Sequence, residues 1–378
     1  MKIVFTGGGT GGHFYPIISV VQAINEKVAE KKILQPKMYF MSPTKYNARA
    51  LFDNDIEFIR IPAGKIRRYF SILNFTDVFI TIYGVILAII KLYMIYPDIV
   101  FGKGGYTSFP TLFAAKLLRI PVVIHESDST PGIVNKWASK FAERIAISYQ
   151  EAANAFPKQN ALGKVAFTGN PIRKEIVYPL TNGAREYLNL EEGTPTILVL
   201  GGSQGSQNIN EAILDGIGEL VKKYQVIHQT GRTNLAGAIS ASSVILKDNP
   251  YAHRYHPFDY LNDLALRMSA GVADIVVSRA GSTIFEISAW GLPSIIIPLP
   301  KEISHDQIKN AFAYARTGAC IVVEEFNLTS HILASEIDRI VNNSATNEKM
   351  RQGARQFSHT DAGSKIAEVI LEIALKHE

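Results

Sequence analysis

The chain has 378 residues, of which 47% are hydrophobic and 19% charged, and this suits a globular protein of about two domains, each with its own core. The net charge of +5 comes from lysines and arginines spread along the chain without a nucleic-acid-binding motif, so we expect no nucleic acid partner and favour an anionic small molecule or membrane surface. The single Cys320 excludes an intramolecular disulfide and a cysteine-based zinc cluster, and it suits a reducing cytoplasm.

The first 28 residues predict a strand, a glycine loop and a helix in succession. The apolar run 3–5 is typical of a buried strand, and because this strand starts at residue 2 we expect no signal peptide. Five glycines follow within positions 7–12, and after His13 apolar side chains recur at helical spacing, with Pro16 near the expected helix entrance. Such a loop presents unpaired N–H groups and the positive end of a helix dipole, so we expect it to bind an anion, most simply a phosphate.

Other interpretations compete for this loop. Gly7, Gly9 and Gly12 match the dinucleotide fingerprint, but the next expected strand, 37–41, is followed by Ser-Pro-Thr and not by the acid that would hold the ribose of NAD. A Walker A loop is excluded because His13, not Lys followed by Ser or Thr, comes after the second glycine pair. His13 could also cap or pack against the helix, but its place at the mouth of the loop favours a functional role.

The segment 79–90, FITIYGVILAII, is an uncharged apolar run that we expect to form a buried or interfacial helix. Its 12 uninterrupted residues are fewer than the ~18–20 that cross a bilayer. Immediately upstream, Lys65, Arg67 and Arg68 stand beside aromatic residues, a pattern typical of a membrane-surface patch. An ordinary core helix preceded by a solvated turn is the alternative.

Short apolar strands alternate with amphipathic helices along most of the chain, which predicts α/β domains with parallel sheets covered on both faces. The expected strands are 3–5, 38–41, 58–61, 99–101, 122–124, 145–147 and 165–167, then 196–200, 225–228, 253–255, 275–277, 294–297 and 319–322. The pattern breaks around 169–176, and a second strand and glycine turn, TILVLGGSQG, then mirrors the first. We therefore expect two doubly wound domains, 1–172 and 173–359, and a C-terminal helix at about 360–378 that packs on either of them.

Polar turns follow several expected strands directly. In the first half these are GGGTGGH, GKGGYTSFP at 102–110 and HESDSTPG at 125–132. The carboxyl ends of parallel strands lie at one edge of the sheet, where such folds bind their ligands. We therefore expect the three turns to form one site.

In the second half, candidate binding residues are most concentrated in the segment 278–300, SRAGSTIFEISAWGLPSIIIPLP. A strand ends at Ser278-Arg279 and a helix begins near Thr283, with Glu286 on the same face one turn later. A helix N-terminus can hold a diphosphate while a carboxylate accepts both ribose hydroxyls, so this helix could bind a nucleotide. The alternative is a capping box made by Thr283 and Glu286. Further on, Asp306 and Gln307 could hold sugar hydroxyls.

Taken together, GGGTGGHFYP, GGYTSFP, HESD-TPGIVNK, GNPIR, GGSQG, HQTG, SRAGSTIFE and HDQIKNA resemble, in order and spacing, the motifs of the MurG family. The similarity covers nearly the whole chain. Members of this family are bacterial glycosyltransferases of the GT-B fold, two Rossmann-like domains with an interdomain cleft. The resemblance implies inverting transfer of N-acetylglucosamine from UDP-GlcNAc to the MurNAc 4-hydroxyl of lipid I, which is undecaprenyl-pyrophosphoryl-MurNAc-pentapeptide, to give lipid II for peptidoglycan.

The resemblance also assigns roles to positions of this chain. In the family the first glycine loop faces the acceptor diphosphate, here Thr10, Gly11 and Gly12. The residues implied around the donor are Arg173, Ser203 and Thr283 for the diphosphate, Glu286 for the ribose, Asp306 and Gln307 for the GlcNAc hydroxyls, Tyr260 and Leu261 for uracil, and Asn210, which stands where the family has a functional asparagine. The membrane patch implied on the N-terminal domain is Lys65, Arg67, Arg68, Phe79, Ile82 and Ile86. The protein would thus bind an anionic membrane surface peripherally, on its cytoplasmic face.

Two departures from the family pattern affect the site. Many members have His-Glu-Gln-Asn where this chain has HESD at 125–128, so Asp128 places a carboxylate where an amide is usual. The segment from Arg279 to Glu286 is one residue shorter than in many members, which leaves the roles of 280–282 open.

The implied reaction needs a base and a means of neutralising the UDP that leaves. We expect His13, whose ordinary pKa is about 6.5, to accept the proton of the acceptor hydroxyl, with Asp128 and Glu126 as rivals. Arg173, Ser203 and the helix at Thr283 could neutralise the diphosphate, so we expect no metal or other cofactor. Three alternatives remain at this point: another GT-B UDP-sugar transferase with a lipid acceptor, a UDP-GlcNAc epimerase, and a non-catalytic nucleotide-sugar-binding module.

Overall fold

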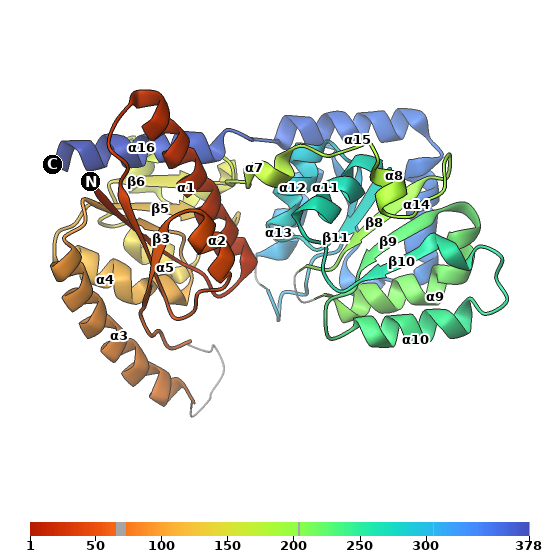
Figure 1. The fold of residues 1–378 in the computed structure, drawn as a ribbon, viewed down its shortest axis with the longest axis horizontal. Helices are drawn as coiled ribbons and strands as arrows, with labels where there is room; N and C mark the ends of the chain where they lie inside the picture. The colour runs from red at the N-terminus through yellow and green to blue at the C-terminus, as the bar shows by residue number, and fades with distance from the viewer. Residues whose placement is uncertain (66–72, 203–204, 305, 378) are drawn as a thin grey trace. The chain divides into compact units, whose positions relative to one another are not determined.

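The computed structural model describes residues 1–65, 73–202, 205–304 and 306–377 and divides the chain into two compact units. The first unit is Met1–Arg173 with His359–Glu378, and the second is Lys174–Ser358. The chain therefore enters the second unit after Arg173, against an expected boundary after 172, and returns to the first unit for its last helix (Figure 1).

The first unit is built on a seven-stranded, all-parallel sheet in the order β3-β2-β1-β4-β5-β6-β7. Its strands are β1 (Lys2–Thr6), β2 (Lys37–Ser42), β3 (Ile56–Arg60), β4 (Ile99–Gly102), β5 (Val122–Glu126), β6 (Arg144–Ile147) and β7 (Val165–Phe167). The strand order reverses between β1 and β4, and in doubly wound sheets the crevice at such a reversal is where ligands bind.

The second unit has a six-stranded, all-parallel sheet in the order β10-β9-β8-β11-β12-β13. Its strands are β8 (Thr196–Leu200), β9 (Gln225–Gln229), β10 (Tyr255–Phe258), β11 (Ile275–Ser278), β12 (Ser294–Ile296) and β13 (Cys320–Val322). The order reverses between β8 and β11. The expected fold class, two Rossmann-like domains, is confirmed, with strand ends within three residues of the expected ones.

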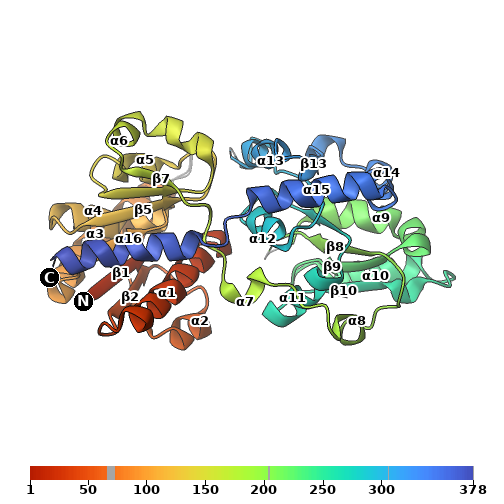
Figure 2. The same cartoon turned by 90° about the horizontal axis from the view of Figure 1, so that it is seen from above.

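Helices cover both sheets (Figures 1 and 2). In the first unit they are α1 (Gly11–Lys31), α2 (Ala48–Asp53), α3 (Leu73–Ile95), α4 (Phe109–Leu117), α5 (Ile133–Ala138), α6 (Pro157–Ala161) and α16 (Ala362–His377), with 3₁₀ turns η1 (Tyr106–Ser108) and η2 (Gln150–Ala155). In the second unit they are α7 (Lys174–Val177), α8 (Ala184–Tyr187), α9 (Gln207–Lys223), α10 (Leu235–Ile245), α11 (Asp263–Val272), α12 (Thr283–Trp290), α13 (Gln307–Ala315), α14 (Ser330–Val341) and α15 (Ser344–Phe357), with η3 (Ala252–Arg254) and η4 (Glu325–Asn327).

Helix α1 begins earlier than expected. The helix starts at Gly11, with Thr10 as its N-cap residue, so Pro16 lies inside it and not at its entrance. Pro16 has no N–H to donate to the carbonyl four residues before it, Gly12, but helices tolerate this near their first turns. As a consequence, Gly11, Gly12 and His13 belong to the first helical turn and not to the preceding loop.

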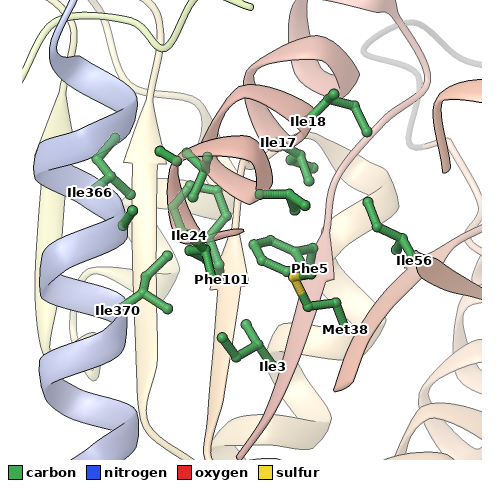
Figure 3. Packing of buried hydrophobic residues seen from close by; sticks show 14 of the residues in the cluster. Ile3, Phe5, Ile17, Ile18, Ile24, Met38, Ile56, Phe101, Ile366 and Ile370 are labelled. Atoms are coloured by element: carbon green, nitrogen blue, oxygen red, sulfur yellow. The ribbon is translucent and has the colours of Figure 1, made fainter. Parts of the chain in front are cut away.

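The C-terminal helix α16 packs against α1 and completes the core on one face of the first sheet (Figure 3). Side chains of β1 alternate between faces: Ile3 and Phe5 belong to the cluster that contains α1 and α16, and Val4 to the cluster on the side of α3 and α4. Ile366 and Ile370 of α16 are buried in the first cluster. The last twenty residues are therefore part of the first unit's core.

Replacing Ile370 with Ala is expected to lower the free energy of unfolding of the first unit by about 2–5 kcal/mol, because the side chain is completely buried. The matched control on the same helix is Leu375→Ala, whose side chain is 43% exposed, and here we expect a loss below about 1 kcal/mol. Chemical unfolding followed by tryptophan fluorescence in a Trp290→Phe background measures this, because the remaining Trp137 lies in the first unit. Equal losses for the two variants would show that α16 is not packed as described.

Helix α3 is longer and more exposed than the sequence suggested. It has 23 residues, and its stretch Phe75–Ile95 is long and apolar enough to cross a membrane by length and composition alone. Allowing Lys91, the apolar segment extends to about Tyr96, which agrees with the end of the helix at Ile95, but the helix begins at Leu73, before the run 79–90. The judgement that the segment is too short to cross a bilayer, made from the 12 uninterrupted residues, does not hold for the whole helix. One side packs on α4, but Phe79, Ile82 and Ile86 are each more than half exposed. The alternative of an ordinary core helix is wrong.

Candidate active site

The glycine loop between β1 and α1 has backbone φ angles that residues with side chains rarely adopt. Gly7, Gly8 and Gly9 have φ angles of 153°, 111° and 85°, in the region that favours glycine. The loop ends at Thr10, whose carbonyl accepts hydrogen bonds from the N–H groups of His13 and Phe14. The N–H groups of the first turn of a helix have no partner within the helix, so this end of α1 suits an anion.

His13 is held at the mouth of this loop. Its Nδ1 lies 3.0 Å from the Thr10 hydroxyl, and its Nε2 lies beside Gly105, where a side chain would begin 3.7 Å from that nitrogen. Burial and, to a lesser extent, the Lys103 ammonium lower the pKa of His13 to about 4, although Asp128 acts in the opposite direction. The imidazole is therefore neutral at physiological pH.

Glu126 is the last residue of β5 and anchors the turn that follows it. Its Oε1 accepts from the Asp128 N–H at 3.0 Å, and its Oε2 accepts from the Gly132 N–H at 3.0 Å and from the Asn135 amide at 2.9 Å. Burial and then the Asp128 carboxylate raise the pKa of Glu126 to about 7, although these hydrogen bonds act in the opposite direction. Both oxygens are thus engaged in holding the loop that carries Asp128.

Lys103 is a buried cation that the sequence analysis missed. It follows β4 directly and is 1% exposed, and its Nζ donates to Asn170 Oδ1 at 3.4 Å. The lysine was visible in the turn GKGGYTSFP, but nothing in that local sequence distinguishes a buried lysine from a solvated one. It brings a positive charge into the group formed by His13, Glu126 and Asp128.

Arg173 is the last residue of the first unit before the chain leaves it. It is 8% exposed, and its guanidinium lies 3.9 Å from the ring centre of Tyr15 on α1, a cation–π contact. Arg173 is thus positioned by α1. Ser203, the other residue expected at the diphosphate from this part of the sequence, lies outside the described residues, as do Arg67 and Arg68 of the expected membrane patch.

In the second unit, Gln229 at the end of β9 joins two turns of the site. Its amide donates to the Gly202 carbonyl at 3.0 Å, and its Oε1 accepts from the Leu261 N–H at 3.0 Å. Gly205 is required beside it, because a Cβ there would lie 1.9 Å from the Thr230 carbonyl oxygen. Gln229 belongs to the HQTG motif, and its role as a bridge was not predicted. Tyr260 precedes Leu261, and its N–H donates to Asp259.

Asn210 is buried in a hydrogen-bonded chain. Its amide nitrogen donates to the Thr230 carbonyl, which leaves Oδ1 to face His228 Nε2 at 3.0 Å, and His228 Nδ1 lies 3.0 Å from the Tyr255 hydroxyl. Because Asn210 Oδ1 can only accept, His228 carries its proton on Nε2 and accepts from Tyr255 on Nδ1. Burial lowers the pKa of His228 to about 3, consistent with a neutral ring. Asn210 therefore shapes the turn after β9.

Helix α12 begins at Thr283, as expected, and Glu286 lies in its first turn. The capping-box alternative is wrong, because Ser282 occupies the N-cap position and makes no side-chain capping hydrogen bond. Thr283 and Glu286 thus stand at a helix N-terminus at the carboxyl edge of the second sheet, next to the reversal in strand order.

Arg279, just before this helix, holds the surrounding elements together. Its guanidinium forms an ion pair with Glu325 of η4 and donates to the Ser206 hydroxyl at the N-cap of α9 and to the Ile297 carbonyl. The side chains of Arg279 and Glu325 are 11% and 10% exposed. Arg279 therefore acts as a clamp within the second unit.

Helix α13 carries the remaining two predicted residues. Asp306 is its N-cap residue and Gln307 its first residue. Gln307 Oε1 accepts from the Leu299 N–H at 3.1 Å, which leaves its amide NH₂ as the part able to donate to a sugar. Asn310, one turn on, is buried and its amide lies 3.4 Å from the Ala280 carbonyl, so α13 supports the turn before α12.

The expected residues thus form two groups, one in each unit. His13, Glu126 and Asp128 gather with Lys103 at the carboxyl edge of the first sheet, whereas Asn210, Leu261, Thr283 and Gln307 lie at the corresponding edge of the second. Within the described parts of the chain, no group of three or more His, Cys, Asp or Glu side chains is placed to hold a metal ion.

Comparison with known proteins establishes the family. Residues 3–147 match the glycosyltransferase family 28 N-terminal domain, and residues 196–366 match its C-terminal domain. The chain is 37% identical to the UDP-N-acetylglucosamine–N-acetylmuramyl-(pentapeptide) pyrophosphoryl-undecaprenol N-acetylglucosamine transferase of Treponema denticola, over 98% of this chain and 96% of that protein. The chain belongs to this family of N-acetylglucosamine transferases. A relative of the same name from Halothermothrix orenii is 34% identical over 99% of both chains.

Solved structures agree with the fold. MurG of Acinetobacter baumannii superposes with a TM-score of 0.71 at 22% identity, covering 98% of this chain and 99% of that one. A UDP-GlcNAc 2-epimerase from Neisseria meningitidis, determined with UDP-GlcNAc bound, gives a TM-score of 0.69 at 15% identity and covers the whole of both chains. Both are similar in architecture, so architecture alone does not separate transfer from epimerisation.

Replacing Glu325 with Ala is expected to destabilise the second unit by about 3–5 kcal/mol, because it leaves the largely buried Arg279 guanidinium without its carboxylate. The control is the neighbouring Glu324→Ala, for which a change within about 0.5 kcal/mol is expected. Chemical unfolding followed by the fluorescence of Trp290, in a Trp137→Phe background, reports on this unit. A loss no larger than that of the control would contradict the clamp.

Proposed function

We propose that the protein transfers N-acetylglucosamine from UDP-GlcNAc to the MurNAc 4-hydroxyl of lipid I, giving lipid II. The observation that carries this is the 37% identity with the Treponema denticola enzyme over 98% of this chain. The two groups of functional side chains fit a reaction with two substrates, because each stands at the strand reversal of its own sheet.

The donor is assigned to the second unit. The N-terminus of α12, with Thr283, offers N–H groups to the diphosphate, and Glu286 in the same turn accepts the ribose hydroxyls. The Gln307 amide, together with Asp306, holds the GlcNAc hydroxyls. The backbone at Tyr260 and Leu261, fixed by Gln229, holds the base. Asn210 acts indirectly in this scheme, because its own polar atoms hold the turn after β9.

Charge on the departing UDP is neutralised by the protein in this scheme. The helix N-terminus at Thr283 supplies positive potential, the role of Arg173 at the diphosphate stays an expectation from the family resemblance, and we propose that no metal ion is needed. Ser203 remains an expectation from the family resemblance.

The acceptor is assigned to the first unit, with its diphosphate on the glycine loop at Thr10, Gly11 and Gly12. We assign His13 as the base. If Nδ1–H donates to the Thr10 hydroxyl, Nε2 carries a lone pair on the side of Gly105. Glu126 is less suited, since its oxygens hold the Asp128 turn. Asp128 remains the rival.

The decisive assay measures UDP release with and without a soluble, short-chain lipid I analogue, and we expect release to depend on it. His13→Ala should lower kcat by about 10²- to 10⁴-fold, the usual contribution of a general base, while UDP binding is retained. EDTA should leave the rate unchanged. If His13→Ala kept near-normal turnover at saturating substrate and Asp128→Ala did not, Asp128 would be the base.

The same assay separates the alternatives. A UDP-GlcNAc epimerase would incorporate solvent deuterium into the sugar without an acceptor. A transferase for another lipid would release UDP with a diacylglycerol and not with the lipid I analogue. A non-catalytic binding module would bind UDP-GlcNAc and release no UDP under either condition.

We also propose that the protein binds the cytoplasmic face of the membrane peripherally through α3. The exposed side chains of Phe79, Ile82 and Ile86 lie on one helix, and Lys65 is exposed just before the undescribed segment. Apolar side chains that enter the interface and cations near anionic lipid headgroups reinforce each other. The lipid acceptor would then reach the first unit from the membrane.

Changing Phe79, Ile82 and Ile86 together to Ser is expected to weaken binding to vesicles containing anionic lipid by at least about tenfold, because three exposed apolar side chains can no longer enter the interface. The matched control changes Leu34, Phe52 and Leu162 to Ser. These side chains are also exposed in the first unit but do not belong to α3. Vesicle co-sedimentation measures both. Similar losses for the two triple variants would argue against α3 as the membrane surface.

A further inference from the structure

Lys103 is fixed at the centre of the acceptor group by its backbone and by its neighbours. Its N–H donates to the Thr6 carbonyl at 2.9 Å and so continues the pairing of β4 with β1. A Cβ at Gly7 would lie 2.9 Å from the Lys103 Cβ, closer than side chains approach one another. Glycine at position 7 therefore leaves the space through which the lysine side chain enters the interior.

The burial of Lys103 needs a physical explanation. The side chain is 1% exposed, and lysine is almost never so buried without a partner for its charge. The hydrogen bond to the Asn170 amide, at 3.4 Å, is long and neutral, so it does little to offset the loss of hydration. A methionine would fill the same space at lower cost, so the ammonium itself requires a role.

Charged and titratable groups face Lys103 from each surrounding element. His13 lies on the first turn of α1, His125 and Glu126 at the end of β5, and Asp128 in the next turn. Burial lowers the pKa of Lys103 to about 8, while Glu126 and then Asp128 raise it. The same ammonium lowers the pKa of His13 and of His125. Lys103 is thus the cation that couples two carboxylates to two imidazoles.

Of the two carboxylates, Asp128 is the one that acts on both Lys103 and His13. Glu126 already accepts three hydrogen bonds from its own turn, and these favour its charged form. Asp128 adds a negative charge to a site that, under the proposed function, must admit an anionic diphosphate. A compensating cation is therefore needed where Asp128 is present.

We propose that Lys103 is a positioning residue of the acceptor site, a buried counter-charge that compensates the carboxylate of Asp128 and disfavours a second positive charge on His13. The inference rests on the proposed function, since it concerns the acceptor of that reaction. Because Lys103 is enclosed, it acts through Asp128 and His13 and does not touch the acceptor.

The test is a double-mutant cycle with Lys103→Met, Asp128→Asn and the double variant, all in the full chain. Lys103→Met removes the charge at similar volume and takes away the cation that faces the Asp128 carboxylate, so kcat/KM for the lipid I analogue should fall on the order of 10- to 100-fold. Adding Asp128→Asn removes the charge that needed compensation, and the double variant should recover at least about tenfold over Lys103→Met. Failure of the double variant to recover would overturn the proposal.

A second readout follows the protonation of His13. In Lys103→Met the His13 imidazole loses a neighbouring cation, so the pKa of His13 should rise from about 4. Because His13 must be neutral to accept a proton, the acid limb of the kcat/KM profile should then move to higher pH. The wild type should also lose activity as pH passes about 8, where Lys103 gives up its proton, and Lys103→Met should lack that limb. NMR of the histidine ring and pH–rate profiles measure these changes. Unchanged His13 titration in Lys103→Met would refute the coupling.

Controls separate a wrong inference from a wrong function or a damaged fold. Lys103→Met should keep wild-type affinity for UDP, because the donor is assigned to the second unit, and thermal unfolding checks that the first unit stays folded. Absence of acceptor-dependent UDP release by the wild type would reject the proposed function itself. With wild-type activity present, the cycle and the histidine titration decide on Lys103 alone.

Discussion

The parallel pairing of β1 with β4 is the constraint on which the acceptor site depends. Thr6 lies opposite Gly102, so the turns that follow the two strands leave the sheet side by side. The Thr6 carbonyl accepts from the Lys103 N–H and extends this pairing into the turns. One strand then supplies the glycine loop and His13, and the other supplies the buried ammonium. A shift of register would reverse the faces of the side chains and separate these groups.

The strands could be predicted because buried parallel strands are continuous apolar runs bounded by glycine or polar turns. The first and last residues of the helices were harder to predict. The start of α1 was placed too late because glycines favour loops and proline favours a first turn, yet tertiary packing carries the helix through Gly11 and Gly12 and past Pro16. In α3 the end near Tyr96 could be predicted once Lys91 was allowed, but the polar residues Asn74, Thr76 and Asp77 concealed the start of the helix at Leu73.

The location of the site was predictable, and the roles of individual side chains were less so. Polar turns after apolar strands identified the carboxyl edges of both sheets. The partner of each polar atom depends on segments distant in sequence: Asn210 meets His228, Gln229 joins Gly202 to Leu261, and Arg279 meets Glu325. Such contacts leave no local pattern. Lys103 was missed for the same reason, since a lysine in a glycine turn is normally a solvated one.

The two units place charge at the strand reversal in different ways, and this difference fits their assigned substrates. In the second unit the Arg279 charge is neutralised by Glu325 within the fold, so the potential left for the donor comes chiefly from helix N-termini. In the first unit a buried lysine faces two carboxylates, one buried and one half-buried, next to a neutral histidine. Without the ammonium, the carboxylates would repel the acceptor diphosphate and favour protonation of His13. When the ammonium is present, the anion-binding loop and the neutral base can lie next to each other. In a site of low polarity, the balance of fixed charges decides which protonation states persist.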